Sequence, residues 1–351
     1  MSEKIYQQKN AQVGWWLIIG VFMIMIQVVL GGITRLTGSG LSITEWEPLI
    51  KGMLPPANEL QWQAAFEKYK QIGQYKHINF DFSIEDFKFI FFWEWFHRLW
   101  ARLIGFVFII PFFYFIYKKK IGREMVIPMV ILFLLGILQA AIGWLMVKSG
   151  LNVNDVRVSH IRLSIHFIAA FILLCYTFWF ALSLMVPPGQ RTSNASISRL
   201  TIIILCLLGV QLMYGAFMAG LKAGSAAATW PTINGEWWPA GINQKQGIDN
   251  LVSNPITVQF IHRMLAYSLV IFILYWYVKV SKLQSKEWLN NAKKFPLLIV
   301  LIQVILGVVT VLQSPVPSNL LWWGVAHQFV AMLLVLSLFV PLYLVNKKAG
   351  M

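Results

Sequence analysis

The stretch EWFHRLWARLIGFVFIIPFFYFIYKKK, residues 94–120, decides the fold class of this chain. Its apolar run is closed by three lysines, and its other charged or imidazole side chains (Glu94, His97, Arg98 and Arg102) all stand at its start. An α-helix needs roughly 20 apolar residues to cross a bilayer core about 30 Å thick. The stretch therefore predicts a membrane-spanning helix with a polar mouth at one end.

Runs of the same kind recur along the whole chain of 351 residues. They lie near residues 15–33, 88–117, 126–147, 163–186, 200–219, 257–278, 296–313 and 321–345. Hydrophobic residues make up 58% of the sequence and charged residues 12%, whereas about a quarter of an ordinary soluble domain is charged. This composition excludes a soluble enzyme, a disordered chain and a secreted disulfide scaffold. We predict an all-α polytopic membrane protein with eight transmembrane helices.

The formal net charge of +15 indicates the orientation in the membrane. With the N-terminus in the cytoplasm, the cytoplasmic segments hold 15 basic and 3 acidic residues, and the other side holds 14 basic and 11 acidic residues. Basic residues are enriched on the cytoplasmic side of membrane proteins. We therefore expect a multi-pass protein of the cell (plasma or inner) membrane, with both termini in the cytoplasm and no binding of nucleic acid.

Two long connections are expected on the outer side, at residues 34–87 and 220–256. Within the first, the segment NELQWQAAFEKYK (58–70) predicts an amphipathic helix. Long ordered loops are often functional, so we expect both connections to cap a site on the outer face.

A Gln-x-x-x-Gly pattern recurs near the outer end of each odd-numbered span. Its four copies pair Gln27 with Gly31, Gln139 with Gly143, Gln211 with Gly215 and Gln303 with Gly307. At this spacing the amide and the glycine share one helical face, which suits either close helix packing or the close approach of a flat ligand. The pattern predicts a duplicated unit, residues 1–190 and 191–351, arranged as two pseudo-symmetric four-helix bundles.

Four histidines occupy the even-numbered spans, one in each and always near the outer end. They are His97, His166, His262 and His327. A lone intramembrane histidine is most often a structural residue that is hydrogen-bonded between helices. Two in each bundle can instead clamp a planar cofactor, because paired neutral imidazoles are good axial ligands of haem iron; zinc is the weaker alternative. The pattern predicts two porphyrin sites, whereas His77 and His160 are expected to be solvated or to cap loops.

Glu94 precedes His97 by three residues, and the His-Arg pair His97–Arg98 recurs as His262–Arg263 without a glutamate. A carboxylate in a membrane mouth marks a proton or substrate path, and a salt bridge to a neighbouring arginine is the alternative. The arginines can snorkel to lipid headgroups or bind the propionate carboxylates of a porphyrin. We therefore expect chemistry in the first bundle and electron transfer in the second.

Several segments, taken together and in this order, resemble a known family. They are GGITRLTGSGLSITEWEPLIKGMLPP (31–56), EWFHRLWARLIG (94–105), RVSHIRLSIHFIAAF (157–171), TWP (229–231), QFIHRMLAY (259–267) and WGVAHQFVA (323–331). The family is haem A synthase, and the resemblance extends over essentially the whole chain.

The resemblance implies an oxidoreductase of the membrane that converts haem O to haem A, the prosthetic group of terminal oxidases. Two successive hydroxylations of the methyl group at porphyrin C8, followed by loss of water, give the formyl group. Matched residue by residue, the family's axial ligands of the substrate haem fall on His97 and His166. Those of a haem b fall on His262 and His327, and the functional glutamate falls on Glu94.

Three arginines are further candidates: Arg35 and Arg98 for the propionates of the substrate haem, and Arg263 for the haem b site. Residues 34–87 hold no cysteine, so the chain resembles the branch of the family that lacks a cysteine pair in the first outer loop. By analogy with the family, the expected partners are a haem O synthase and an electron acceptor. A homo-oligomer is also an open expectation.

Two other classes of protein remain open. A non-catalytic b-type cytochrome, which passes electrons between a quinone pool and a partner, explains the four histidines equally well but gives Glu94 no task. A transporter built from parallel repeats is expected to place polar groups near the bilayer midplane, whereas here they cluster at the outer mouths.

Overall fold

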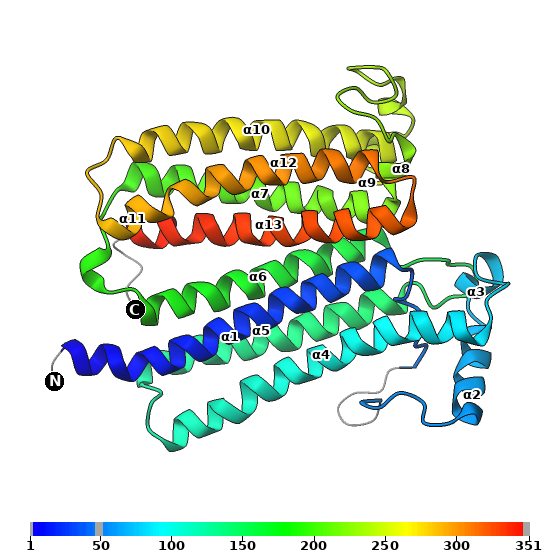
Figure 1. Cartoon of the computed structure of the whole chain (residues 1–351), viewed down its shortest axis with the longest axis horizontal. Coiled ribbons are helices and arrows are strands. Elements are labelled where there is room, and N and C mark those ends of the chain that lie inside the picture. Colours follow the sequence, from blue (N-terminus) through cyan, green and yellow to red (C-terminus); the bar gives the residue numbers. More distant parts are fainter. Residues whose placement is uncertain (1–2, 46–51, 347–351) are drawn as a thin grey trace.

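The computed structural model describes residues 3–45 and 52–346, with the side chains of residues 11–45 and 52–346. In this part of the chain, eight helical segments are long and apolar enough to cross a membrane, and they run alongside one another (Figure 1). The helices are α1 (Glu3–Leu36), α4 (Ile84–Tyr117), α5 (Arg123–Lys148), α6 (His160–Met185), α7 (Ala195–Leu221), α10 (Pro255–Ser281), α12 (Lys294–Leu312) and α13 (Pro317–Val345). The prediction of an all-α polytopic membrane fold with eight spans is confirmed.

Polar caps explain why several helices extend beyond their apolar runs. Helix α4 begins four residues before its predicted start, because Ser83 and Asp86 form a capping box. The Ser83 amide donates to Asp86 Oδ2 at 2.9 Å, and the Asp86 amide donates to Ser83 Oγ at 3.3 Å. Helix α7 begins with a single side-chain cap, in which the Ile197 amide donates to Asn194 Oδ1 at 3.0 Å. Such caps carry no hydropathy signal, so the apolar run alone underestimates each helix.

Short helices lie in the connections at the two ends of the molecule (Figure 1). The first long connection holds α2 (Glu59–Tyr69) and α3 (Gly73–His77), and the second holds α8 (Ala223–Ala226), η2 (Ala240–Asn243) and α9 (Gly247–Ser253). The opposite end holds η1 (Pro188–Gln190) and α11 (Glu287–Ala292), near the start of α1 and the end of α13. Helix α2 confirms the amphipathic helix predicted within residues 58–70.

The spanning helices pack in a regular order. Helix α1 packs against α4 and α6, and α5 packs against α6; α7 packs against α10 and α13, and α12 packs against α10 and α13. Contacts of α6 with α7 and of α1 with α13 join the two halves. The division at residues 190 and 191 and the pseudo-twofold relation between the halves stay predictions.

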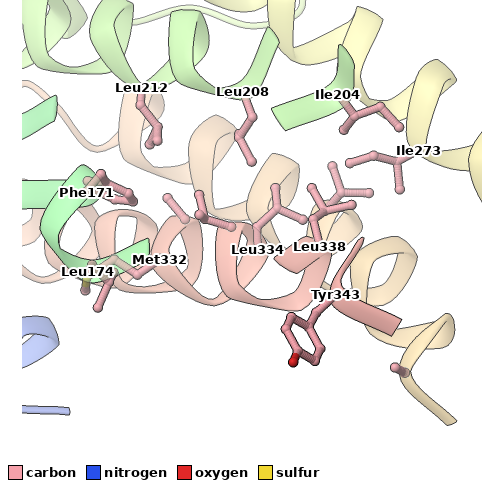
Figure 2. Packing of buried hydrophobic residues seen from close by; sticks show 14 of the residues in the cluster. Phe171, Leu174, Ile204, Leu208, Leu212, Ile273, Met332, Leu334, Leu338 and Tyr343 are labelled. Carbon is pink, nitrogen blue, oxygen red and sulfur yellow. The ribbon is translucent and has the colours of Figure 1, made fainter. Parts of the chain in front are cut away.

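The largest buried cluster lies where α6, α7, α10 and α13 meet (Figure 2). Phe171 and Leu174 of α6 belong to it with Leu208 of α7, Ile273 of α10 and Leu338 of α13, and each of these side chains is buried. Helices in lipid associate through close van der Waals packing, because the lipid tails are as apolar as the side chains. This cluster therefore fixes the two halves relative to each other and so positions the site at their shared end.

Candidate functional site

Each of the four spanning histidines contacts the glutamine of a neighbouring odd-numbered span. The contacts join a glutamine Nε2 to a ring nitrogen: Gln27 to His97 at 2.9 Å, Gln139 to His166 at 3.2 Å, Gln211 to His262 at 3.3 Å and Gln303 to His327 at 3.3 Å. In each contact the glutamine amide donates to the ring nitrogen, which fixes the orientation of the imidazole. The repeated glutamine thus positions an imidazole, a role that its spacing in the sequence left open.

The repeated glycine makes room for the same ring. A Cβ atom at Gly143 would lie 2.7 Å from His166 Cε1, and one at Gly307 would lie 3.0 Å from His327 Cε1. At Gly31 and Gly215 the nearest ring atom would be 3.4 Å away. The glycines therefore allow close packing of a histidine ring against each odd-numbered span, and the approach of a flat ligand to the same helical face stays a prediction.

One continuous cavity of about 1290 Å³ is lined by all four histidines and their glutamines. Pockets for small molecules usually have volumes of about 300–1,000 Å³, so this cavity has room for more than one large planar ligand. His97 and His166 line the part of the cavity in the first half of the chain, and they are close enough for charges on the two rings to interact. The ring centroids of His262 and His327 are 6.5 Å apart. Because bonds from a metal to an imidazole nitrogen are about 2.0 Å long, this spacing suits one metal ion between the two rings.

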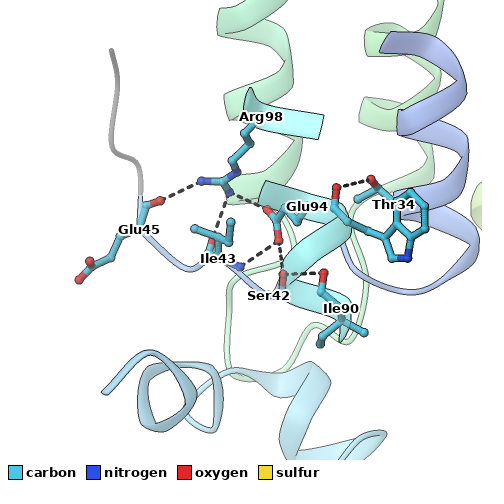
Figure 3. Close-up of polar contacts among 8 residues, drawn as sticks. Thr34, Ser42, Ile43, Glu45, Ile90, Glu94 and Arg98 are labelled. Atoms are coloured by element: carbon cyan, nitrogen blue, oxygen red, sulfur yellow. Dashed lines mark hydrogen bonds and ion pairs between the residues drawn. The ribbon is translucent and has the colours of Figure 1, made fainter. Parts of the chain in front are cut away.

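Glu94 lies on α4 and lines the cavity, although only 2% of it is exposed. Figure 3 shows its carboxylate between Arg98, Ser42 and Ile43. Its Oε1 accepts from Arg98 at 2.6 Å, and its Oε2 accepts from the Ser42 hydroxyl at 2.8 Å and from the Ile43 amide at 2.9 Å. Arg98 also donates to the backbone carbonyls of Ile43 and Glu45, at 2.9 and 3.0 Å. The structure therefore contains the salt bridge that the sequence offered as the alternative to a proton or substrate path at Glu94. This salt bridge keeps the carboxylate at the cavity wall.

The second half holds a neutral counterpart of this arrangement. Gln259 stands three residues before the α10 histidine, is fully buried and donates to the Ala227 carbonyl at 2.8 Å. Arg263 donates to the carbonyls of Thr229 at 2.6 Å and Thr232 at 3.1 Å. In both halves, therefore, the arginine that follows the histidine anchors the long outer connection, but only the first half places a charged carboxylate beside it.

Three basic side chains line the same cavity near the junction of the halves: Arg35, Arg157 and Lys222. Among the residues that the structure describes, none of the three forms an ion pair or a side-chain hydrogen bond. Partial burial, followed by the charges of Arg157 and Arg35, lowers the pKa of Lys222. The cluster is an unneutralised positive site suited to carboxylate groups. Arg35 was predicted from the sequence; Arg157 and Lys222 were missed because only the fold brings them together.

The two remaining histidines lie away from this cavity. His77 ends α3 and is exposed, and His160 Nε2 contacts the Ser253 hydroxyl at 3.3 Å. Both positions agree with the expected solvated or loop-contacting roles. In the described ranges, no group of three or more His, Cys, Asp or Glu side chains has the arrangement of a metal site, which gives the zinc alternative no support.

Known proteins are similar to this chain along nearly its whole length. A family model described as "Cytochrome oxidase assembly protein" matches residues 14–339. A protein of Flavobacterium johnsoniae named "Heme A synthase" is 40% identical over 346 residues, which are 97% of this chain and 100% of the relative. The chain belongs to the haem A synthase family. Proteins of the same name from Flavobacterium psychrophilum and Rhizorhabdus wittichii are each 43% identical, over 93% and 94% of this chain and 96% and 92% of their own lengths.

Membership of the haem A synthase family does not by itself assign roles to individual side chains. The roles predicted for the four histidines, Glu94 and the three arginines stay predictions, as does the branch without the cysteine pair. Residues 46–51, part of the first segment that resembles the haem A synthases, lie outside the described residues, as do the basic residues Lys347 and Lys348.

The glycine beside His166 offers a direct test of the first histidine pair. Gly143→Ala is expected to displace the ring, because the new methyl group would overlap Cε1. Overpacking costs about 1–3 kcal/mol, so haem at this pair should bind roughly 5- to 150-fold more weakly. Titration of the purified protein with haem, followed by absorption spectroscopy, measures the change. Gly209→Ala on α7 is the matched control, since its Cβ would meet no described atom within 4 Å; equal affinities in the two variants would contradict the assignment.

Proposed function

We propose that this chain acts as a haem A synthase that oxidises the C8 methyl group of haem O to a formyl group. The observation that carries the proposal is the single cavity with two histidine pairs, each ring held by a glutamine, in a chain whose full-length relatives are named for this activity. The first pair, His97 and His166, would hold the iron of the substrate haem. Glu94 lines that part of the cavity and is the candidate catalytic residue.

The salt bridge to Arg98 places a cation against Glu94 and holds its carboxylate at the cavity wall. Each hydroxylation of the methyl group removes two electrons and releases protons, so a carboxylate at the cavity wall can accept a proton or stabilise positive charge at the reacting carbon. Arg98 donates once through Nη1 and twice through Nη2, to Glu94 and to two loop carbonyls. We therefore assign Arg98 as a positioning residue for Glu94, and it stays a candidate propionate ligand because it also lines the cavity.

The second pair fits a resident haem b. The Nδ1 atoms of His262 and His327 are buried and have no hydrogen-bond partner within the described part of the chain. Buried polar atoms are normally paired, and a ligand in the cavity would satisfy such nitrogens. Haem b would supply one-electron redox chemistry when bound. Arg263 would position the connection at residues 229–232 over this site through its bonds to the loop carbonyls.

Arg35 would bind a propionate of the substrate haem, with Arg157 and Lys222 adding positive charge around it. Hydrogen bonds between charged groups are worth about 1.5–3 kcal/mol, so Arg35→Gln should weaken the binding of haem by roughly tenfold or more. Binding of the dimethyl ester of haem, which lacks free carboxylates, should not change. Spectroscopic titration with both ligands measures the two affinities. Lys76→Gln removes an exposed charge near the same loops and is the control; an equal loss for acid and ester would refute propionate binding.

The cellular setting belongs to the same proposal. The excess of basic residues on one side supports cytoplasmic termini and a site near the outer surface of the plasma or inner membrane. A haem O synthase would supply the substrate, an electron acceptor would take the electrons, and a homo-oligomer is compatible with the exposed apolar helices.

Expression in a bacterium that makes haem O but no haem A tests the proposed function. Chromatography of the extracted haems should show haem A, or haem O hydroxylated at the methyl group, only when the chain is present. Haem B alone would favour the b-type cytochrome, and a protein without pigment would favour the transporter. Either of these results would overturn the proposal.

A further inference from the structure

The two halves differ at the seam between their second and third spanning helices. In the second half, α10 packs along α12. In the first half, the corresponding helices α4 and α5 pack against α1 and α6 and lack such close backbone packing against each other within the described residues. Side chains still bridge them farther from the histidines, where the rings of Phe108 and Phe133 stack with centroids 6.5 Å apart, so the gap is confined to the part of the seam near the histidine pair. The seam between α4 and α5 is therefore the place where the first bundle is open at its side.

Small residues on both helices account for this opening. Gly105 of α4 stands eight positions after His97, where the second half has Val270 after His262. On α5, Gly136 and Ala140 flank Gln139 at the positions where Val300 and Val304 flank Gln303. A Cβ atom at Gly105 or Gly136 would meet no described atom within 4 Å, whereas Val300 is only 2% exposed. The valines occupy more volume at these positions of the second half, and the glycines leave space at the matching positions of the first half.

The cavity reaches the outer surface of the helices at this seam. Ile109 of α4 and Phe133 and Ile137 of α5 line the cavity, yet they are 41%, 46% and 51% exposed. The residues at the matching positions of the second half, counted from His262 and Gln303, are Leu274, Leu297 and Leu301. None of these lines the cavity. A side chain that borders the cavity and is also exposed marks an opening, and these faces are apolar enough to meet lipid.

We propose that the seam between α4 and α5 is a lateral opening through which the isoprenoid tail of the substrate haem extends into the bilayer. This inference rests on the proposed function. Haem O differs from haem b by a long isoprenoid tail on one edge of the macrocycle, and such a tail costs no desolvation in lipid, whereas a closed core would have to enclose it. The open seam lies beside the pair assigned to the tail-bearing haem. The seam that carries the valines lies beside the pair assigned to the haem without a tail.

Closing the seam tests the proposal. The variant Gly136→Val with Ala140→Val copies the residues of the second half, and Ala141→Val, on an exposed position of α5 that does not line the cavity, is the control. Detergent-purified full-length protein is titrated with haem O and with haem b, and the bound haems are extracted and separated. The closed variant should lose at least tenfold in affinity for haem O, keep its affinity for tail-free haem at the first pair, and retain haem b at the second.

Three outcomes decide the matter. Unchanged affinity of the closed variant for haem O would overturn the lateral opening. An equal loss for both haems would also overturn it, because the substitutions would then act on the macrocycle and not on the tail. Failure of the wild type to retain haem O would instead overturn the proposed function, on which the inference rests. If the double variant does not accumulate, Ala140→Val alone carries the same comparison, with a smaller expected loss for haem O only.

Discussion

Glu94→Gln is expected to leave both haems bound and to lower formation of the formyl product by about 100-fold, the lower range for loss of a general acid or base. Glutamine keeps the size of the side chain and can still accept hydrogen bonds from Ser42 and Ile43. It removes the negative charge that faces the cavity and pairs with Arg98. The substitution gives the first half the neutral amide that the second half already has at Gln259.

The measurement for Glu94→Gln is the ratio of haem A to haem O extracted from cells that express the variant at the wild-type level. Glu45→Gln is the matched control. Its exposed carboxylate pairs with Lys68, and only its backbone carbonyl contacts Arg98, so it removes one negative charge from the same region without touching the cavity. Unchanged haem A formation in Glu94→Gln would contradict the catalytic assignment. An equal loss in both variants would point to the loop rather than to the carboxylate.

Alanine substitutions of the four histidines should separate the two haem sites. His97→Ala and His166→Ala are expected to abolish retention of haem O and haem A and to leave haem b in place. His262→Ala and His327→Ala are expected to release haem b, because an axial ligand supplies the only specific bond to the iron on its side of the macrocycle. Both losses should be nearly complete, so chromatography of the extracted haems resolves them directly.

The histidine series has an internal control in His77→Ala, an exposed position outside the cavity that should keep the full complement of haem. A series in which every one of the four variants lost both haems equally would show that the histidines act on folding and not on separate sites. If His97→Ala released haem b and His262→Ala released haem O, the substrate site would lie in the second half and the haem b site in the first, which is the reverse of the assignment.

The fold followed from the sequence because its main determinant is local. A bilayer requires long apolar runs, and each run from α1 to α13 could be recognised without knowledge of its neighbours. The amphipathic pattern of α2 is equally local. Helix ends were less predictable, since caps such as Ser83 and Asn194 lie outside the apolar runs. The repeated Gln-x-x-x-Gly pattern marked four equivalent positions, but it did not reveal that a histidine ring fills the space left by each glycine.

The candidate site was only partly predictable, because its contacts join residues far apart in the chain. The sequence placed Glu94 beside Arg98, but the bonds from Ser42 and Ile43 cross about 50 residues and one long connection. Arg157 and Lys222 come from two different connections and meet Arg35 only in the folded molecule. The wide seam between α4 and α5 depends on the distance between two helix backbones within the described residues, and that distance leaves no motif other than the small side chains beside it.

The continuity of the cavity bears on how electrons would cross the protein. Both histidine pairs line one continuous space, so haems held by them would share a cavity. Electron transfer between them would then depend on the gap between the two porphyrin edges. In a redox titration, the two haem irons should therefore influence each other electrostatically. The oxidation state of one iron should shift the midpoint potential of the other.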